Sequence, residues 1–309
     1  MICLKYINRS IEDLVNASDK GTRQMKKERS KYYGPVMMLL AAICFSLGGL
    51  LCKLIPWSAL AINGFRDLIG SMILGAYMLI THRRLRVNPV VIFGAVCMFG
   101  VTTLFVMANK MTTAANTIVL QYTAPIWVLI LMALLFHKKP ARADYITIAA
   151  VFLGILCFFI DSLSAGGLAG DLLAILAGVF YAGLFILNSF DRGDAISSLF
   201  LGQLAAGVLL TPLLARETDF SIVPVTAAVI LGAVQVGLAY VFFYLGTKHT
   251  APVTASLIAG VEPVLNPVLV AIFWGEHLSP LSLCGAAVVI LTILLYNLRG
   301  AGNHSPSQP

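Results

Sequence analysis

One carboxyl group lies in the middle of a long apolar run near the C-terminus. Glu262 is the twelfth residue of the run from 251 to 274, so a helix there would place its carboxyl near the centre of a bilayer. A charged group at that depth costs roughly 3 kcal/mol even on mild scales, so it must face a cavity or a partner. Pro263 and Pro267 follow, and each removes a backbone donor and disfavours helical geometry in the preceding residue. We expect a broken helix beside this carboxyl, an arrangement typical of transporter binding sites.

The carboxyl of Glu262 has two interpretations. Removal from water favours the neutral, protonated form, so the group could exchange a proton during a transport cycle or contact a substrate. The alternative is a structural carboxyl that is permanently hydrogen-bonded to an adjacent helix. The sequence leaves both open.

One cation also lies within an apolar run. Arg66 is near the middle of the run from 57 to 80, with Asp67 beside it. The side chains of successive helical residues point about 100° apart, so Arg66 and Asp67 need not form an ion pair with each other. Arg66 could hold a substrate carboxylate with two parallel hydrogen bonds. It could instead close a structural network with Asp67 or Glu262, which is the more usual role of a buried arginine.

Uncharged polar side chains occur at similar depth in other apolar runs. Tyr240 and Tyr244 are one helical turn apart, and Gln235 precedes them by about a turn. Small-molecule pockets are mostly apolar with a few such groups, although each could equally make an interhelical hydrogen bond. The predicted substrate-binding or coupling residues are Glu262, Tyr240, Tyr244, Gln235, Asn266, Asn116, Gln121, Tyr181 and Arg66.

The composition indicates the elements that must position these side chains. Of 309 residues, 59% are hydrophobic and 11% charged, which excludes a water-soluble monomer. Apolar stretches long enough to cross a bilayer as helices recur along the chain. We therefore predict an all-α polytopic membrane protein with ten transmembrane helices, near 35–55, 57–80, 88–109, 113–136, 142–160, 171–190, 195–215, 222–247, 251–274 and 279–298.

The distribution of basic residues predicts the orientation of these helices. If the N-terminus is cytoplasmic, most of the 21 lysines and arginines fall in cytoplasmic segments. Only Lys110 and Arg216 then lie outside, with Lys53 and Arg66 in or at the edge of a span. The positive-inside rule therefore places both termini in the cytoplasm. The net charge of +7 needs no nucleic acid as a partner, because anionic lipid of the bilayer would attract it.

The N-terminal tail, residues 1–34, is basic and polar. Residues 2–17 could form an amphipathic helix on the membrane surface, or residues 1–24 could be an extension without function before Met25. The simpler interpretation is the extension. The six cysteines show no CxxC spacing, so we interpret them as packing residues and expect neither a disulfide framework nor a metal site. We also expect no cofactor.

An internal repeat divides the chain. At an offset of 138 residues, Lys110 aligns with Lys248 and Pro125 with Pro263. The prediction is a first five-helix repeat at 35–160, an external linker at 161–170, a second repeat at 171–299 and a cytoplasmic tail at 300–309. Five is odd, so the halves insert in opposite directions, as in many secondary transporters. The predicted hinges are Pro125, Pro263 and Pro267.

Short motifs in a characteristic order accompany this repeat. They are Phe65-Arg66, Gln121-Tyr122-Thr123-Ala124-Pro125, Val261-Glu262-Pro263-Val264 and Trp274-Gly275-Glu276-His277-Leu278. With two five-helix halves, the chain from Pro35 to Arg299 resembles the EamA family of the drug/metabolite transporter superfamily. The resemblance implies a ten-helix carrier of the bacterial inner membrane with a central cavity lined by both halves. The first half departs from the pattern, because Phe136-His137-Lys138-Lys139 stands where the Gly-Glu motif would recur.

The expected function is transport. We predict a secondary active or facilitative transporter, an exporter of small metabolites such as amino acids or drug-like compounds, which works by alternating access. It could use the proton gradient or work by facilitated diffusion. The alternative is a membrane-embedded enzyme or a receptor without transport activity. An enzyme would need catalytic groups at membrane depth, yet all five histidines lie at span ends or in the tail, and there is no HExxH pair or phosphate-binding loop.

Overall fold

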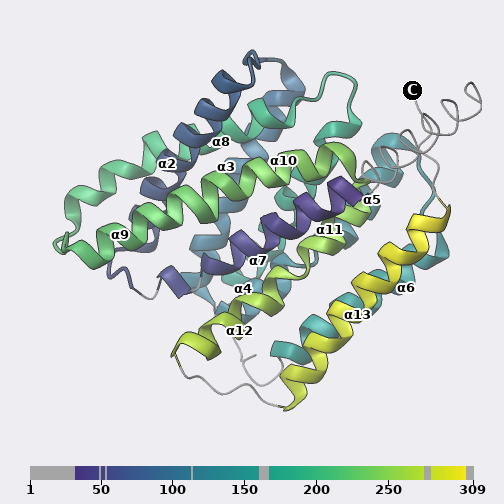
Figure 1. Cartoon of the computed structure of the whole chain (residues 1–309). Coiled ribbons are helices and arrows are strands. Elements are labelled where there is room, and N and C mark those ends of the chain that lie inside the picture. The colour runs from purple at the N-terminus through teal and green to yellow at the C-terminus, as the bar shows by residue number, and fades with distance from the viewer. Residues whose placement is uncertain are drawn as a thin grey trace, which may run out of the picture.

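The structure, a computed structural model, describes residues 32–48, 50–52, 54–112, 114–159, 167–274 and 280–303. These residues form helices joined by short connections, and no strand occurs among them (Figure 1). Six helical segments in the described residues are long and apolar enough to cross a membrane. They are Tyr32–Cys52, Pro89–Ala108, Thr117–Phe136, Leu168–Ser189, Ala195–Arg216 and Ile222–His249. The chain is therefore an all-helical, polytopic membrane protein, as predicted.

Helix is present within each of the ten predicted spans. The first helix, Tyr32–Cys52, begins three residues earlier than expected, and so does α7. The other helices are α2 (Ala59–Ile80), α3 (Pro89–Met111), α4 (Ala114–Gln121), α5 (Ala124–Phe136), α6 (Arg142–Phe159), α7 (Leu168–Ile186), η2 (Leu187–Ser189), α8 (Ala195–Leu210), η3 (Thr211–Arg216), α9 (Ile222–Ile230), η4 (Leu231–Leu238), α10 (Ala239–His249), α11 (Pro252–Ala259), α12 (Glu262–Trp274) and α13 (Pro280–Asn303). Most of the predicted tails and linker, and the Gly275-Glu276 motif, lie outside the described residues.

The fourth and ninth spans are each two helices, broken at equivalent positions. The chain leaves α4 after Gln121 and enters α5 at Ala124, and it leaves α11 after Ala259 and enters α12 at Glu262. Pro125 and Pro263 each occupy the second position of the new helix, where no backbone N–H is needed for intrahelical bonding. The break predicted at Glu262 is therefore observed, and the first half contains its counterpart.

The eighth span contains a π-helical turn. The segment η4 joins α9 to α10 without interruption and includes Gln235. Helices of this type are rare and concentrate at functional sites. Gly232 and Gly237 let η4 approach α2 closely, because a Cβ at either position would lie 2.8 Å from an isoleucine side chain of α2.

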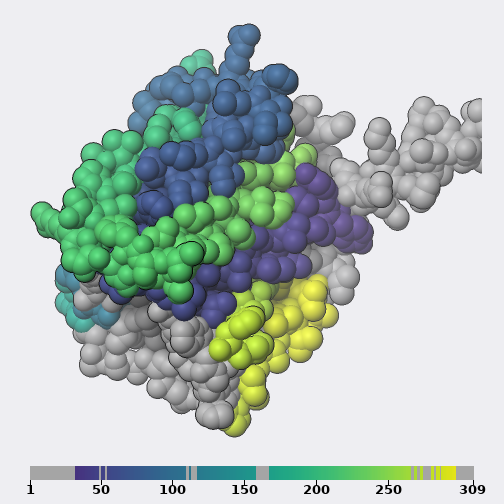
Figure 2. Space-filling model, turned by 60° about the vertical axis from the view of Figure 1, so that its left-hand side comes forward, coloured from purple at the N-terminus to yellow at the C-terminus, as the bar shows by residue number. Residues whose placement is uncertain are grey.

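Contacts between the two halves come in equivalent pairs. Helix α3 packs against α7 and α8, α2 against α8 and η4, α5 against α11, and α6 against α13 along one side of the bundle (Figure 1). The first helix lies along α10, where the Phe45 and Tyr240 rings are 4.9 Å apart, and Figure 2 shows these two segments side by side. When whole spans rather than single helices are compared, exchanging the two halves converts each of these contacts into another of the set or into itself.

The two ends of the bundle differ in chemistry. At one end, Trp57 is buried, donates from Nε1 to the Asp219 carbonyl at 2.6 Å, and packs against Phe220. Aromatic residues of this kind are typical of a membrane–water interface. The opposite end of α2 leads into a connection that contains Arg83, Arg84 and Arg86.

This asymmetry predicts which end is accessible from outside. In a cysteine-free background, Thr218→Cys should react with an impermeant thiol reagent added to intact cells, because its exposed loop lies at the Trp57 end. Arg192→Cys, exposed at the arginine-rich end, should react only after permeabilisation. The reverse labelling pattern would show that the termini lie outside the cytoplasm.

Candidate functional site

A cavity of about 80 Å³ lies where both halves meet. The first helix, α2, α3, α7, η4 and α10 contribute to its wall, together with both helix breaks. The lining residues are Phe45, Arg66, Asp67, Val101, Thr102, Phe105, Gln121, Tyr122, Tyr181, Gln235, Val236, Tyr240 and Glu262. Apolar and aromatic walls with a few polar groups are typical of small-molecule sites.

The two broken helices meet in this cavity through one hydrogen bond. Tyr122 lies in the break between α4 and α5, and its hydroxyl donates to the Oε2 carboxylate oxygen of Glu262, the first residue of α12. The tyrosine is buried, with 5% of its surface exposed. Because a hydroxyl donor to a carboxylate makes a strong bond away from water, this contact links the first half to the second.

A short network on α2 holds the cation of the cavity. Arg66 donates from Nε and Nη2 to the Asn63 amide oxygen, at 3.1 and 2.7 Å. The Asn63 amide donates in turn to Asp67 Oδ2 at 3.3 Å, and Arg66 Nε lies 3.9 Å from Asp67 Oδ1. Spacings of three and four residues put these groups on one helix face. An arginine has five N–H donors, so the guanidinium keeps donors for a ligand while the network fixes its position.

Aromatic side chains complete the wall. The rings of Tyr122 and Tyr181 are 6.3 Å apart and nearly perpendicular, and Phe45 meets Tyr240 edge-on. Edge-to-face packing is a preferred geometry for aromatic pairs. The tyrosines therefore supply both a tightly packed surface and hydroxyl groups.

Most of the predicted site residues lie together. Glu262, Arg66, Gln121, Tyr181, Gln235 and Tyr240 all line the central cavity. Tyr244 does not, because one turn of α10 carries it into a second hollow at the arginine-rich end. The predicted hinges Pro125 and Pro263 are buried at the two breaks. The side chains of Asn116, Asn266 and Pro267 lie outside the described residues.

Sequence reasoning missed three polar residues of this cavity, Asp67, Thr102 and Tyr122. Asp67 is fully buried, and the rule that predicts a functional role for Glu262 applies equally to this carboxyl, because it too lies within a span. Tyr122 belongs to the Gln-Tyr-Thr-Ala-Pro motif, but nothing in the sequence indicates that it bonds to Glu262. Within the described residues, no cluster of three or more His, Cys, Asp or Glu side chains could hold a metal ion.

Comparison with known proteins identifies the family. The model of the EamA-like transporter family matches residues 32–160 and again residues 168–298. The uncharacterized transporter YwfM of Bacillus subtilis (strain 168) is 30% identical over 84% of this chain and 92% of its own length. The threonine/homoserine exporter RhtA of Escherichia coli (strain K12) is 25% identical over 83% of this chain and 88% of its own length.

A solved crystal structure shares the fold. It superposes with a TM-score of 0.75 at 18% sequence identity and covers 88% of this chain and 99% of that chain. The two matches to this family model together cover nearly all of the described residues, whose helices surround a central cavity. The chain therefore belongs to the EamA-like transporter family and is a multi-pass membrane transporter.

Proposed function

We propose that this transporter exports small amino-acid-like metabolites across the inner membrane in exchange for protons. The observation that carries the proposal is the Tyr122–Glu262 hydrogen bond, which places a carboxyl group in the central cavity between the broken helices of the two halves. The relative named as a threonine/homoserine exporter supports both the direction and the substrate class.

The charges of the cavity favour a substrate with an ammonium group. Two carboxyl groups, Asp67 and Glu262, share the cavity with one guanidinium, that of Arg66. An unbalanced charge away from water is costly, so a proton or another cation must compensate the second carboxylate. An amino acid supplies an ammonium group for this purpose and a carboxylate for Arg66. Proton and substrate then compete for one carboxyl group, which is the basis of exchange.

The size of the cavity supports alternating access. Ligand pockets usually measure about 300–1,000 Å³, whereas this cavity measures about 80 Å³. A substrate of amino-acid size therefore needs the cavity to widen. The helix breaks beside Pro125 and Pro263 are suited to that movement, because tighter turns replace regular α-helical hydrogen bonding there, where the two halves meet.

The proposal includes ten transmembrane helices in two inverted five-helix repeats, at 35–160 and 171–299, with both termini in the cytoplasm. The equivalent contacts between the halves, the equivalent helix breaks and the basic residues at one end support it. Two similar halves can exchange conformations and so open the cavity to either side.

Counterflow in proteoliposomes tests the function. Vesicles preloaded with unlabelled threonine should accumulate labelled threonine, and an imposed proton gradient should drive net movement. Preloading with N-acetylthreonine, which lacks the ammonium group, should support neither. Equal exchange of threonine and N-acetylthreonine would contradict the proposed substrate class. So would the absence of exchange for threonine and related amino acids.

The variant Glu262→Gln tests the coupling role. Glutamine keeps the shape and hydrogen bonding of the side chain but can neither exchange a proton nor pair with an ammonium group. Gradient-driven transport should therefore fall at least tenfold, and the threonine exchange that remains should be weaker and independent of pH. Tyr122→Phe is the matched control: it removes the hydroxyl donor but leaves the carboxyl, so transport should weaken and stay pH-dependent.

Thermal stability distinguishes a structural role of Glu262 from a coupling role. If Glu262 only holds the helices together, Glu262→Gln and Tyr122→Phe should lower the melting temperature similarly and leave the pH profile of the remaining transport unchanged. A Glu262→Gln protein with the transport, pH profile and melting temperature of the native chain would exclude both a coupling and a structural role.

The proline beside Glu262 gives a separate prediction about movement. Pro263→Ala restores a backbone donor and lets the break become helical, so it should slow turnover several-fold while substrate affinity changes less than twofold. Pro89→Ala, at the first position of α3 and away from the cavity, should leave both unchanged. Normal turnover of Pro263→Ala would make the proline a packing residue rather than a hinge.

A further inference from the structure

A second hollow, of about 730 Å³, opens at the arginine-rich end of the bundle. The connection between α2 and α3, the connection between η2 and α8, and the last turns of α10 form its wall. Among its lining residues are Arg83, Arg84, Leu85, Arg86, Tyr244 and Lys248. The family assignment and the central cavity give this hollow no role.

The charge of this hollow is strongly positive. Three arginines and Lys248 line it, against one carboxyl group, that of Asp194. The Oδ2 atom of Asp194 already accepts a hydrogen bond from the Ser197 hydroxyl. Within the part of the chain that the structure describes, none of the four cations forms an ion pair. A concave surface lined by one sign of charge concentrates counter-ions.

Several contacts hold Arg83 and the backbone beside the other arginines in place. The guanidinium carbon of Arg83 lies 5.6 Å from the centre of the Tyr244 ring. The backbone N–H of Arg86 donates to the Ser197 hydroxyl at 3.1 Å, and the Asn88 amide donates to the Arg192 carbonyl at 3.0 Å. The connection between α2 and α3 is thus fixed to α8, so the backbone that carries the three arginines is held in place before an anion arrives.

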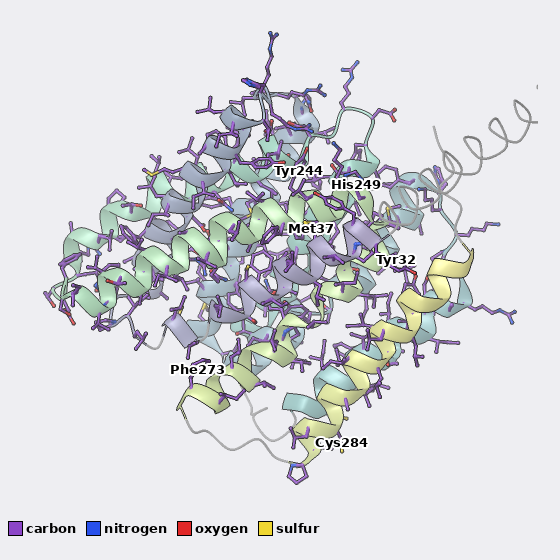
Figure 3. The ribbon with its side chains drawn as sticks, in the orientation of Figure 1. Tyr32, Met37, Tyr244, His249, Phe273 and Cys284 are labelled. Atoms are coloured by element: carbon purple, nitrogen blue, oxygen red, sulfur yellow. The ribbon has the colours of Figure 1, made fainter. Side chains whose placement is uncertain are left out.

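Helix α10 connects the hollow with the central cavity. Tyr244 lines the hollow, and Tyr240, one turn earlier, lines the cavity. Figure 3 shows Tyr244 and His249 near one end of the bundle, with Phe273 and Cys284 towards the other. Tyr244 itself is buried, meets Tyr77 edge-on at 6.2 Å, and lies beside the fully buried Phe243. Buried aromatic rings of α10 therefore lie between the residues that line the two spaces.

We propose that this hollow is an anion-binding vestibule, which captures the carboxylate of an outgoing substrate before the substrate passes Tyr244 into the central cavity. The inference rests on the proposed export and orientation. A carboxylate or phosphate group on a small molecule fits the guanidinium groups, and an anionic lipid headgroup has the same chemistry.

A labelling experiment tests the vestibule without relying on transport. Leu85, which lines the hollow and is 47% exposed, is replaced by cysteine in a cysteine-free chain held in phosphatidylcholine nanodiscs. An anionic methanethiosulfonate should react about tenfold faster than a cationic one of similar size at low salt. Near 1 M salt the preference should disappear, because the screening length falls to about 3 Å.

Two matched triple variants locate the source of this preference. Arg83→Gln, Arg84→Gln and Lys248→Gln together should abolish the preference for the anionic reagent. Lys138→Gln, Lys139→Gln and Arg142→Gln remove the same charge from exposed positions outside the hollow and should leave it intact. Equal loss in both variants would mean a general surface charge and would overturn the proposal, as would the absence of any preference in the parent protein.

Further arms separate the two kinds of occupant. If the preference in phosphatidylcholine is lost when phosphatidylglycerol is added, a lipid headgroup fills the hollow and substrate capture is wrong.

In proteoliposomes, the triple variant Arg83→Gln, Arg84→Gln and Lys248→Gln should raise the KM for threonine several-fold at unchanged kcat. Its KM for threoninamide, which lacks the carboxylate, should be unchanged. A normal KM for threonine would overturn substrate capture. Absence of threonine transport in the parent protein, with the labelling preference intact, would instead count against the proposed function.

Discussion

A charged group inside a bilayer must be satisfied by the protein, because the hydrocarbon core offers no water. This requirement applies to Arg66 and Asp67, which are neighbours in one apolar span, and to Glu262, which lies in another span distant in sequence. The fold meets it by placing all three around one small cavity. The same arrangement that lowers the cost of these charges creates a polar site at the junction of the two halves.

The helix breaks make this junction possible. In a continuous helix from 252 to 274, the backbone groups would be hydrogen-bonded within the helix, and Glu262 would lie in its middle rather than at the start of a new helix. Instead, each half contains a break just before a proline, and Tyr122 at the first break reaches Glu262 at the second. Similar elements from both halves therefore meet through this one hydrogen bond.

The two hollows have complementary chemistry. The central cavity combines two carboxyl groups with one guanidinium, whereas the hollow at the end of the bundle has four cations and one carboxyl. On the proposed route, a zwitterionic substrate would meet groups for its carboxylate first and groups for its ammonium later. The tyrosines of α10 stand between these two stages.

The sequence by itself determined the helical membrane architecture, the position of the break at Glu262 and six of the residues that line the cavity. These follow from local properties: hydropathy, the missing N–H of proline and the cost of a charge in an apolar run. Only the tertiary structure decided that Tyr122 is the partner of Glu262, that Asp67 shares the cavity, and that Tyr244 faces a different space. Those outcomes depend on how closely helices approach, as where Gly232 and Gly237 bring η4 against α2. Contacts between segments more than a hundred residues apart are set by that packing, which a local pattern does not record.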